Sequence, residues 1–82
     1  MTATKSDIER WLGTAKEKGA SHLIVAVDRY DHDNYPIYVW PEQKIQEEID
    51  RVDPENMQGI DEVYNMSMDI NEQLSEYRAY NI

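Results

Sequence analysis

Several residue types are scarce or missing in this chain of 82 residues, and each shortage excludes a structure or a chemistry. There is no cysteine, which excludes disulfide bonds, thiolate ligands for zinc and a thiol nucleophile. The three glycines stand alone at positions 13, 19 and 59, so the chain has no glycine-rich loop for binding phosphate. The longest unbroken aliphatic run, Leu23 to Val27, is far too short to cross a lipid bilayer.

A chain of this length has room for one domain, which we expect to comprise residues 1–82. So small a domain buries only about 60% of the surface that its unfolded chain exposes, so it needs good packing or self-association. Phenylalanine is absent, but two tryptophans and six tyrosines supply large side chains for packing. The first seven residues lack the apolar run of a signal peptide, so we expect a soluble cytoplasmic protein.

Positive charge is also scarce, because eight lysines and arginines oppose seventeen aspartates and glutamates, for a formal net charge of −9. Such a field repels nucleic acids and anionic membranes and attracts a basic protein surface. Six acids gather around one predicted helix and its end: Glu42, Glu47, Glu48, Asp50, Asp53 and Glu55. This acidic surface is the predicted partner-binding site, although the same charges would also keep a small protein soluble.

The N-terminal region predicts an amphipathic helix. Residues 6–9, with the sequence SDIE, have the pattern of a capping box. One helical stripe follows, made of Ile8, Trp11, Leu12 and Ala15. Gly19 is a natural helix end, whereas Gly13 inside the helix costs about 1 kcal/mol relative to alanine and would let a neighbour approach closely.

Two β-strands are predicted next. Residues 22–27 are apolar on both faces, which is typical of a strand covered on each side, and residues 35–40 form the second strand. Pro36 belongs at the start of that strand or on a sheet edge, and Asn34 suits a left-handed turn position. A connecting loop of odd length would collect the aliphatic side chains on one face, namely Leu23, Val25, Val27, Ile37 and Val39. Because register follows the buried pattern, we expect this odd loop.

The second half of the chain predicts helices. Pro41 opens one of them, with an inward stripe at Ile45, Ile49 and Val52 and with Glu47 and Glu48 facing largely outward. Asp53 and Pro54 restart the chain ahead of a second helical stripe formed by Met57, Ile60, Val63 and Tyr64. Residues 69–72 give a further capping signal before the stripe Ile70, Leu74 and Tyr77.

The resulting order is α-β-β-α-α-α, an α+β domain in which a two-stranded antiparallel hairpin packs with about four helices. A two-stranded sheet leaves both of its edges unpaired. We therefore expect a homo-oligomer, most simply a homodimer.

The hairpin between the strands is rich in polar groups, with Asp28, Asp31, His32 and Asp33 close together. Such ligands suit a divalent ion, but the glycine and the closing glutamate of a calcium-binding loop are missing, so a polar turn is favoured. Asp28 has two interpretations. It either pairs with an arginine or caps backbone amides, or it is a carboxylate with a raised pKa in an aromatic pocket. The first is favoured, and the sequence predicts no metal, no cofactor and no catalytic residue.

Two segments carry a resemblance, "WLGTAKEKGASHLIVAVDRYDHDNYPIYV" and "EVYNMSMDINEQLSEYRAYNI". They resemble a family of short proteins encoded by bacteriophages and prophages, and the resemblance covers residues 8–82. It rests on a general pattern and carries no catalytic residues. It implies a small accessory protein made inside an infected bacterium, where such proteins are associated with blunting host defences.

Two functions remain as hypotheses, both without catalysis. The favoured one is protein–protein interaction, with the acidic surface inhibiting a host defence protein by occupying its basic, nucleic-acid-binding site. The alternative is an oligomeric binder of a nucleotide signal, in which aromatic rings stack on the base and an arginine meets the phosphate. Its ligand face would consist of Asp28, Tyr30, Tyr38, Trp40 and Arg78. An enzyme is disfavoured because no catalytic motif is present.

Overall fold

The computed structural model of the protein describes residues 3–52 and 57–82. Within these residues three helices and three strands follow the chain in the order α1 (Lys5–Lys18), β1 (His22–Asp28), β2 (Asp33–Val39), α2 (Ile45–Asp50), β3 (Gln58–Asn65) and α3 (Ile70–Ser75). The strands form one antiparallel sheet in the order β2-β1-β3. The α+β class is confirmed, whereas the predicted two-stranded hairpin with about four helices is wrong.

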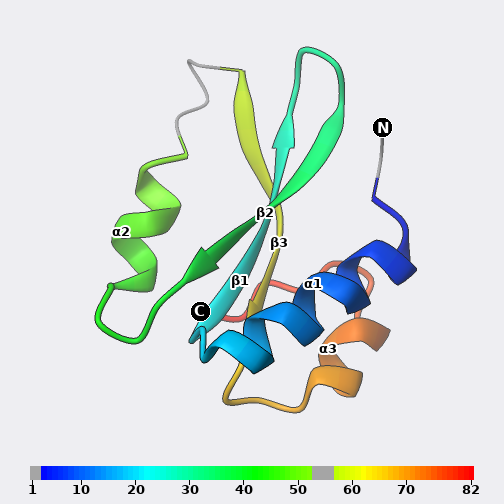
Figure 1. Cartoon of the computed structure of the whole chain (residues 1–82). Helices are drawn as coiled ribbons and strands as arrows, with labels where there is room; N and C mark the ends of the chain where they lie inside the picture. Colours follow the sequence, from blue (N-terminus) through cyan, green and yellow to red (C-terminus); the bar gives the residue numbers. More distant parts are fainter. Residues whose placement is uncertain (1–2, 53–56) are drawn as a thin grey trace.

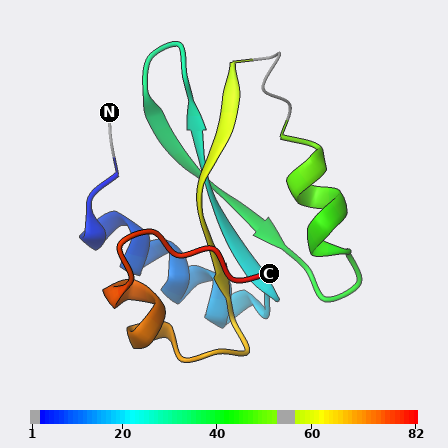
Figure 2. The ribbon, with the colours of Figure 1, turned by 180° about the vertical axis from the view of Figure 1, so that it is seen from behind.

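The sheet has a core on each face. On one face, Leu23 and Val25 of β1 pack against Leu12 of α1, and α3 covers the same face (Figure 1). On the other face, Ile24 and Ala26 lie in a second core that α2 partly covers (Figures 1 and 2). The central strand β1 is therefore buried on both sides, as its apolar sequence predicts.

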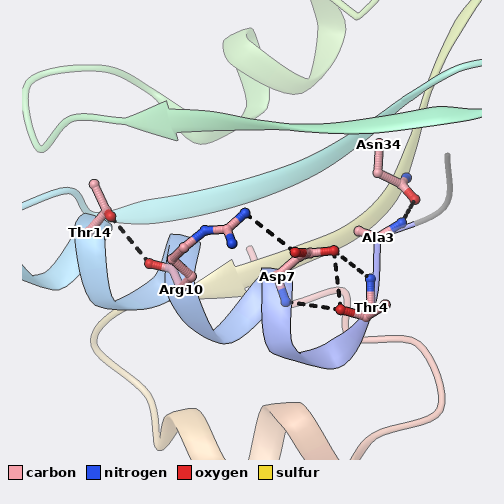
Figure 3. Close-up of polar contacts among 6 residues, drawn as sticks. All are labelled: Ala3, Thr4, Asp7, Arg10, Thr14 and Asn34. Carbon is pink, nitrogen blue, oxygen red and sulfur yellow. Dashed lines mark hydrogen bonds and ion pairs between the residues drawn. The ribbon is translucent and has the colours of Figure 1, made fainter.

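Helix α1 begins earlier than predicted, because its capping box starts at Thr4. The Asp7 amide donates to Thr4 Oγ1 at 3.2 Å, and Asp7 Oδ2 accepts from the Thr4 amide at 3.0 Å (Figure 3). The predicted box at residues 6–9 is wrong, since Ser6 already lies inside the helix. The predicted end is confirmed, with Gly19 left-handed at φ 78°. A Cβ at Gly13 would meet no atom within 4 Å, so the close neighbour expected there is not found among the described residues.

The loop between β1 and β2 spans residues 29–32 and has even length, so the predicted odd loop is wrong. Ile24 pairs with Ile37, which places Asp28 on the same sheet face as Ile37. Both faces of β1 are buried, so its apolar pattern fits either parity and does not select one. The left-handed turn residue is His32, with φ 60°, and the predicted one, Asn34, lies in β2.

Residues 58–65 form strand β3 and not the predicted helix. Val63 lies in the core on the α2 side, and its neighbour Tyr64 lies in the core on the α1 side. Adjacent apolar residues that face opposite cores suit a strand buried on both sides, and the same spacing also matches a helical stripe. The capping signal predicted at Asp53 and Pro54 lies outside the described residues.

The remaining two helices are short. Helix α2 begins at Ile45, so the prediction that Pro41 opens it is wrong, although Ile45 and Ile49 do face the core. Helix α3 begins after Asp69, whose carboxylate accepts from the Glu72 amide at 3.0 Å, which confirms the predicted cap. It ends at Ser75, so the predicted apolar residue Tyr77 is fully exposed instead.

The C-terminal segment, residues 78–81, covers the outer edge of β3 (Figure 2). The Val63 amide donates to the Ala79 carbonyl at 2.9 Å, and the Asn81 amide donates to the Val63 carbonyl at 3.0 Å. The other edge strand, β2, carries Pro36, which is compatible with the predicted edge position. The expectation of two unpaired edges is therefore wrong for β3, and oligomerisation needs another argument.

Candidate functional site

A hollow of about 560 Å³ lies between α1 and the β1–β2 hairpin. Four aspartates, one arginine and two aromatic rings contribute to its lining: Asp7, Asp28, Asp31, Asp33, Arg10, Trp11 and Tyr35. We refer to it as the hairpin hollow. It collects carboxylates from two segments that are far apart in the sequence.

The α1 wall of the hairpin hollow is set by helical spacing. Asp7, Arg10 and Trp11 stand at i, i+3 and i+4, which places them on one side of the helix. Arg10 Nη2 lies 3.3 Å from Asp7 Oδ1, so the cation of the lining is paired within α1 (Figure 3). Hydrogen bonds from Thr4, chiefly from its backbone amide, hold the pKa of Asp7 below its usual range, and the charge of Arg10 lowers it further.

Asn34 of β2 connects the α1 wall of the hairpin hollow to the hairpin wall. Its Oδ1 accepts from the Ala3 amide at 2.8 Å, just before α1 begins (Figure 3). Its Nδ2 donates to Asp61 Oδ2 at 2.8 Å and to the Ala26 carbonyl at 3.1 Å. These bonds connect the start of α1 to all three strands, so the hollow is shaped before any ligand arrives.

The hairpin wall brings Asp28 next to Tyr35. Asp28 Oδ1 accepts from the Tyr30 amide at 2.9 Å, which is the backbone-capping contact favoured from the sequence. Burial raises the pKa of the Tyr35 hydroxyl, and the negative charge of Asp28 raises it further. Asp28 therefore stabilises the turn and also adds negative charge to the hairpin hollow. Asp31 is exposed beside it.

The hairpin hollow is suited to binding a cation reversibly. Carboxylates accept hydrogen bonds from a guanidinium or an ammonium group, and aromatic faces attract such cations. The lining holds four carboxylates and one arginine, which is already paired, so its net charge is negative. No group of three or more histidine, aspartate or glutamate side chains in residues 3–52 and 57–82 is arranged to hold a metal ion.

The predicted acidic surface around α2 is only partly assembled. Three of its members are exposed: Glu42, Glu47 and Asp50. The prediction that Glu48 faces outward is wrong, because its side chain is 11% exposed and accepts a 2.7 Å hydrogen bond from Arg51 Nη1. Glu48 stands beside Ile45 and Ile49 on the helix, which turns it inward. Asp53 and Glu55 lie outside the described residues.

The predicted ligand face is divided between the two edges of the sheet. The rings of Tyr38 and Trp40 are neighbours, with centroids 6.4 Å apart, and Tyr30 is exposed at the hairpin tip. Arg78 lies at the β3 edge, where its guanidinium donates to the carbonyls of Ile60 and Asp61. Tyr38 lies in β2 at the opposite edge and Trp40 follows that strand, so Arg78 does not reach the phosphate of a nucleotide stacked on these rings. Asp28 lies on the other sheet face from Tyr38.

Sequence reasoning singled out Asp28 but missed the other wall of the hairpin hollow. Trp11 was assigned to the apolar stripe of α1, and it does pack against the core while also lining the hollow. The i, i+4 spacing of Asp7 and Trp11 is a signal in the sequence for this wall. Which hairpin residues face that wall depends on the strand register, which the sequence does not reveal.

Comparison of the chain with protein-family models, with curated proteins and with solved structures finds no match. None of the helices in the described part of the chain is long and apolar enough to span a membrane.

Proposed function

We propose that this protein is a small, non-enzymatic binding domain that recognises a basic segment of another protein, and that the hairpin hollow receives an arginine or lysine side chain of that segment. The composition of the hollow supports the proposal, because carboxylates and two aromatic rings surround a space large enough for such a side chain. Basic residues next to the inserted one would meet the further negative charge of the domain.

The cellular setting follows from the resemblance to phage-encoded proteins. In that setting the partner is a host protein, made in the same cytoplasm, whose basic surface binds nucleic acid. An acidic domain seated on that surface would compete with nucleic acid by charge. The main contact lies in the hairpin hollow and not on the surface around α2, where Glu48 is paired and turned inward.

The test is an NMR titration of the ¹⁵N-labelled protein with a nine-residue peptide of alternating arginine and glycine. A matched peptide with citrulline in place of arginine removes the charge and keeps the shape. We expect the arginine peptide to shift the Trp11 indole signal and the amide signals of Asp31, and the citrulline peptide to leave them unchanged. Equal binding of both peptides would exclude recognition of a cation.

Two charge reversals then locate the contact. Asp31→Lys, in the hairpin hollow, is expected to weaken binding of the arginine peptide by about tenfold, the equivalent of roughly 1.4 kcal/mol. Glu47→Lys, on the exposed side of α2, is the matched control and should change the affinity by less than about twofold. A larger loss with Glu47→Lys than with Asp31→Lys would place the contact on the acidic surface around α2.

A further inference from the structure

A second groove, of about 490 Å³, runs between α1 and α3 and shares no lining residue with the hairpin hollow. Apolar side chains form its floor, among them Leu12, Ile70 and Leu74. Gly13 lies on its α1 side, and Glu9 and Lys16 flank that glycine. We refer to it as the α1–α3 groove.

Gly13 is not explained by the packing of the described chain. Glycine in a helix interior lowers helix stability relative to alanine, and Gly13 is in the middle of α1. A Cβ added there would meet no atom within 4 Å, so no neighbour in the described residues needs the missing side chain. The α1 backbone at Gly13 is therefore open to close approach by a second molecule.

Glu9, Gly13 and Lys16 stand at i, i+4 and i+7, so they form one stripe along the helix. Both charged side chains are exposed, and neither forms a hydrogen bond or an ion pair with another side chain in residues 3–52 and 57–82. The stripe thus presents an acid at one end, a base at the other and an open backbone between them.

We propose that the α1–α3 groove is the interface of a homodimer, in which α1 packs antiparallel against α1 of a second copy at Gly13. A two-fold axis requires every contact to occur twice. The stripe meets this requirement when the two-fold axis passes α1 midway between Glu9 and Lys16, which is between Leu12 and Gly13. With the axis at that midpoint, Glu9 faces the partner's Lys16 and Lys16 faces the partner's Glu9.

The same charges exclude the parallel arrangement. Parallel helices in register would place Glu9 against the partner's Glu9 and Lys16 against the partner's Lys16, and both contacts are repulsive. In the antiparallel pair, Gly13 meets the region of the partner's Leu12, where a missing side chain permits close approach of the backbones. Charge complementarity therefore identifies a second copy as the occupant and also sets its direction.

The dimer is independent of the proposed function. Glu9, Gly13 and Lys16 lie on the other flank of α1 from Asp7 and Trp11, at 100° per residue around the helix. A dimer through the α1–α3 groove therefore leaves both hairpin hollows open. Failure of one proposal does not affect the other, because peptide binding and self-association are measured separately.

The test is sedimentation equilibrium of the full chain over a range of concentrations. We expect the wild-type mass to rise from 9.7 kDa towards twice that value. Glu9→Lys and Lys16→Glu should each weaken the dimer by at least about tenfold, because each substitution places like charges at both contacts. An equimolar mixture of these two variants should dimerise again, because every contact then joins opposite charges.

Controls separate the interface from folding. Lys18→Glu, an exposed charge reversal on the opposite flank of α1 and outside the α1–α3 groove, should leave the association unchanged. Gly13→Ala should raise the Tm measured at concentrations where the chain is monomeric, because its methyl group meets open space there, and should weaken the dimer at higher concentrations. Circular dichroism confirms that each variant is folded.

Three results would overturn the proposal. The first is a wild-type chain that stays monomeric at every concentration, even if a helical peptide from another protein occupies the groove. The second is a dimer that both charge reversals leave intact. The third is a mixture of the two reversals that fails to associate.

Discussion

The side-chain amide of Gln73 is hydrogen-bonded to both backbone groups of Asn65. Oε1 of Gln73 accepts from the Asn65 amide at 2.7 Å, and Nε2 donates to the Asn65 carbonyl at 2.9 Å. A primary amide has the same donor and acceptor as a peptide group, so Gln73 takes the place of a neighbouring strand at the end of β3. With the C-terminal segment at Val63, it protects the outer edge of β3.

Gln73→Ala should therefore destabilise the protein strongly. Gln73 is 1% exposed, so the substitution removes the partners of the partly buried Asn65 amide and carbonyl and also opens a cavity. We expect a loss of about 2–4 kcal/mol in the free energy of unfolding, measured by urea denaturation. Asn71→Ala, at an exposed position of the same helix, is the matched control and should cause no loss. A loss below about 0.5 kcal/mol for Gln73→Ala would contradict this account.

Stability should fall as the pH decreases below neutral, because of His22. Its Nδ1 lies 2.9 Å from Ser21 Oγ, and its Nε2 is buried without a partner among the described residues. Burial lowers the pKa of His22 below its ordinary value of 6.5. The unfolded chain therefore takes up a proton more readily than the folded one, so stability is lost as the pH falls through 6.5 towards the folded pKa.

The measurement is the urea midpoint between pH 7.5 and pH 5. His22→Gln removes the titrating ring, so the midpoint should depend less on pH than in the wild type. His32→Gln, at an exposed position of the hairpin loop, is the matched control for the loss of an imidazole. Identical profiles for the wild type and His22→Gln would show that burial of this ring has no such effect.

The capping box of α1 can be located by substitution. Thr4→Ala should lower the free energy of unfolding by about 1 kcal/mol, because it removes the side chain that accepts from an amide of the first turn. Ser6→Ala should cause no loss, because Ser6 is already inside the helix. Thermal unfolding of the two variants compares the observed cap with the cap that the sequence predicts, and a larger loss for Ser6→Ala would favour the predicted one.

The contribution of this cap to the stability of the protein depends on pH. The pKa of Asp7 is lowered in the folded protein from its ordinary 3.8, so its stabilising effect is complete above that value and is lost as the pH falls through the folded pKa. Asp7→Asn should reduce the loss of stability measured below about pH 4. An unchanged acid profile for this variant would show that the carboxylate of Asp7 does not stabilise α1.

Substitution of Asn34 should destabilise the protein more than its position near the hairpin loop suggests. Asn34→Ala removes one acceptor and two donor contacts, to Ala3, Asp61 and Ala26. We expect a loss of about 1–3 kcal/mol in urea denaturation. Asn34→Asp keeps the acceptor for the Ala3 amide but places a second carboxylate beside Asp61. It should therefore be less stable at pH 7 than at pH 4, relative to the wild type, and the absence of this difference would contradict the contact.

Short-range signals account for what could be predicted. The end of α1 at Gly19 and the Asp69 cap of α3 rest on contacts between residues close in the sequence, and the strand predicted over residues 22–27 is visible as an apolar run. Some local predictions failed by a few residues, such as the capping box of α1, and the larger errors depend on distant partners. Residues 58–65 match a helical stripe because a strand buried on both faces has no alternating pattern, and only the pairing of β3 with β1 identifies it as a strand.

The candidate sites divide in the same way. The sequence by itself determined the excess of carboxylates, the polar hairpin and the glycine within α1, because composition and local pattern are enough for these. Only the tertiary structure decided that Asp28 and Trp11 line one hollow, that Glu48 turns inward and that Arg78 lies at the β3 edge. The physical reason is that strand register and helix docking are set by pairing across the sheet and by burial against both of its faces, which bring together residues far apart along the chain.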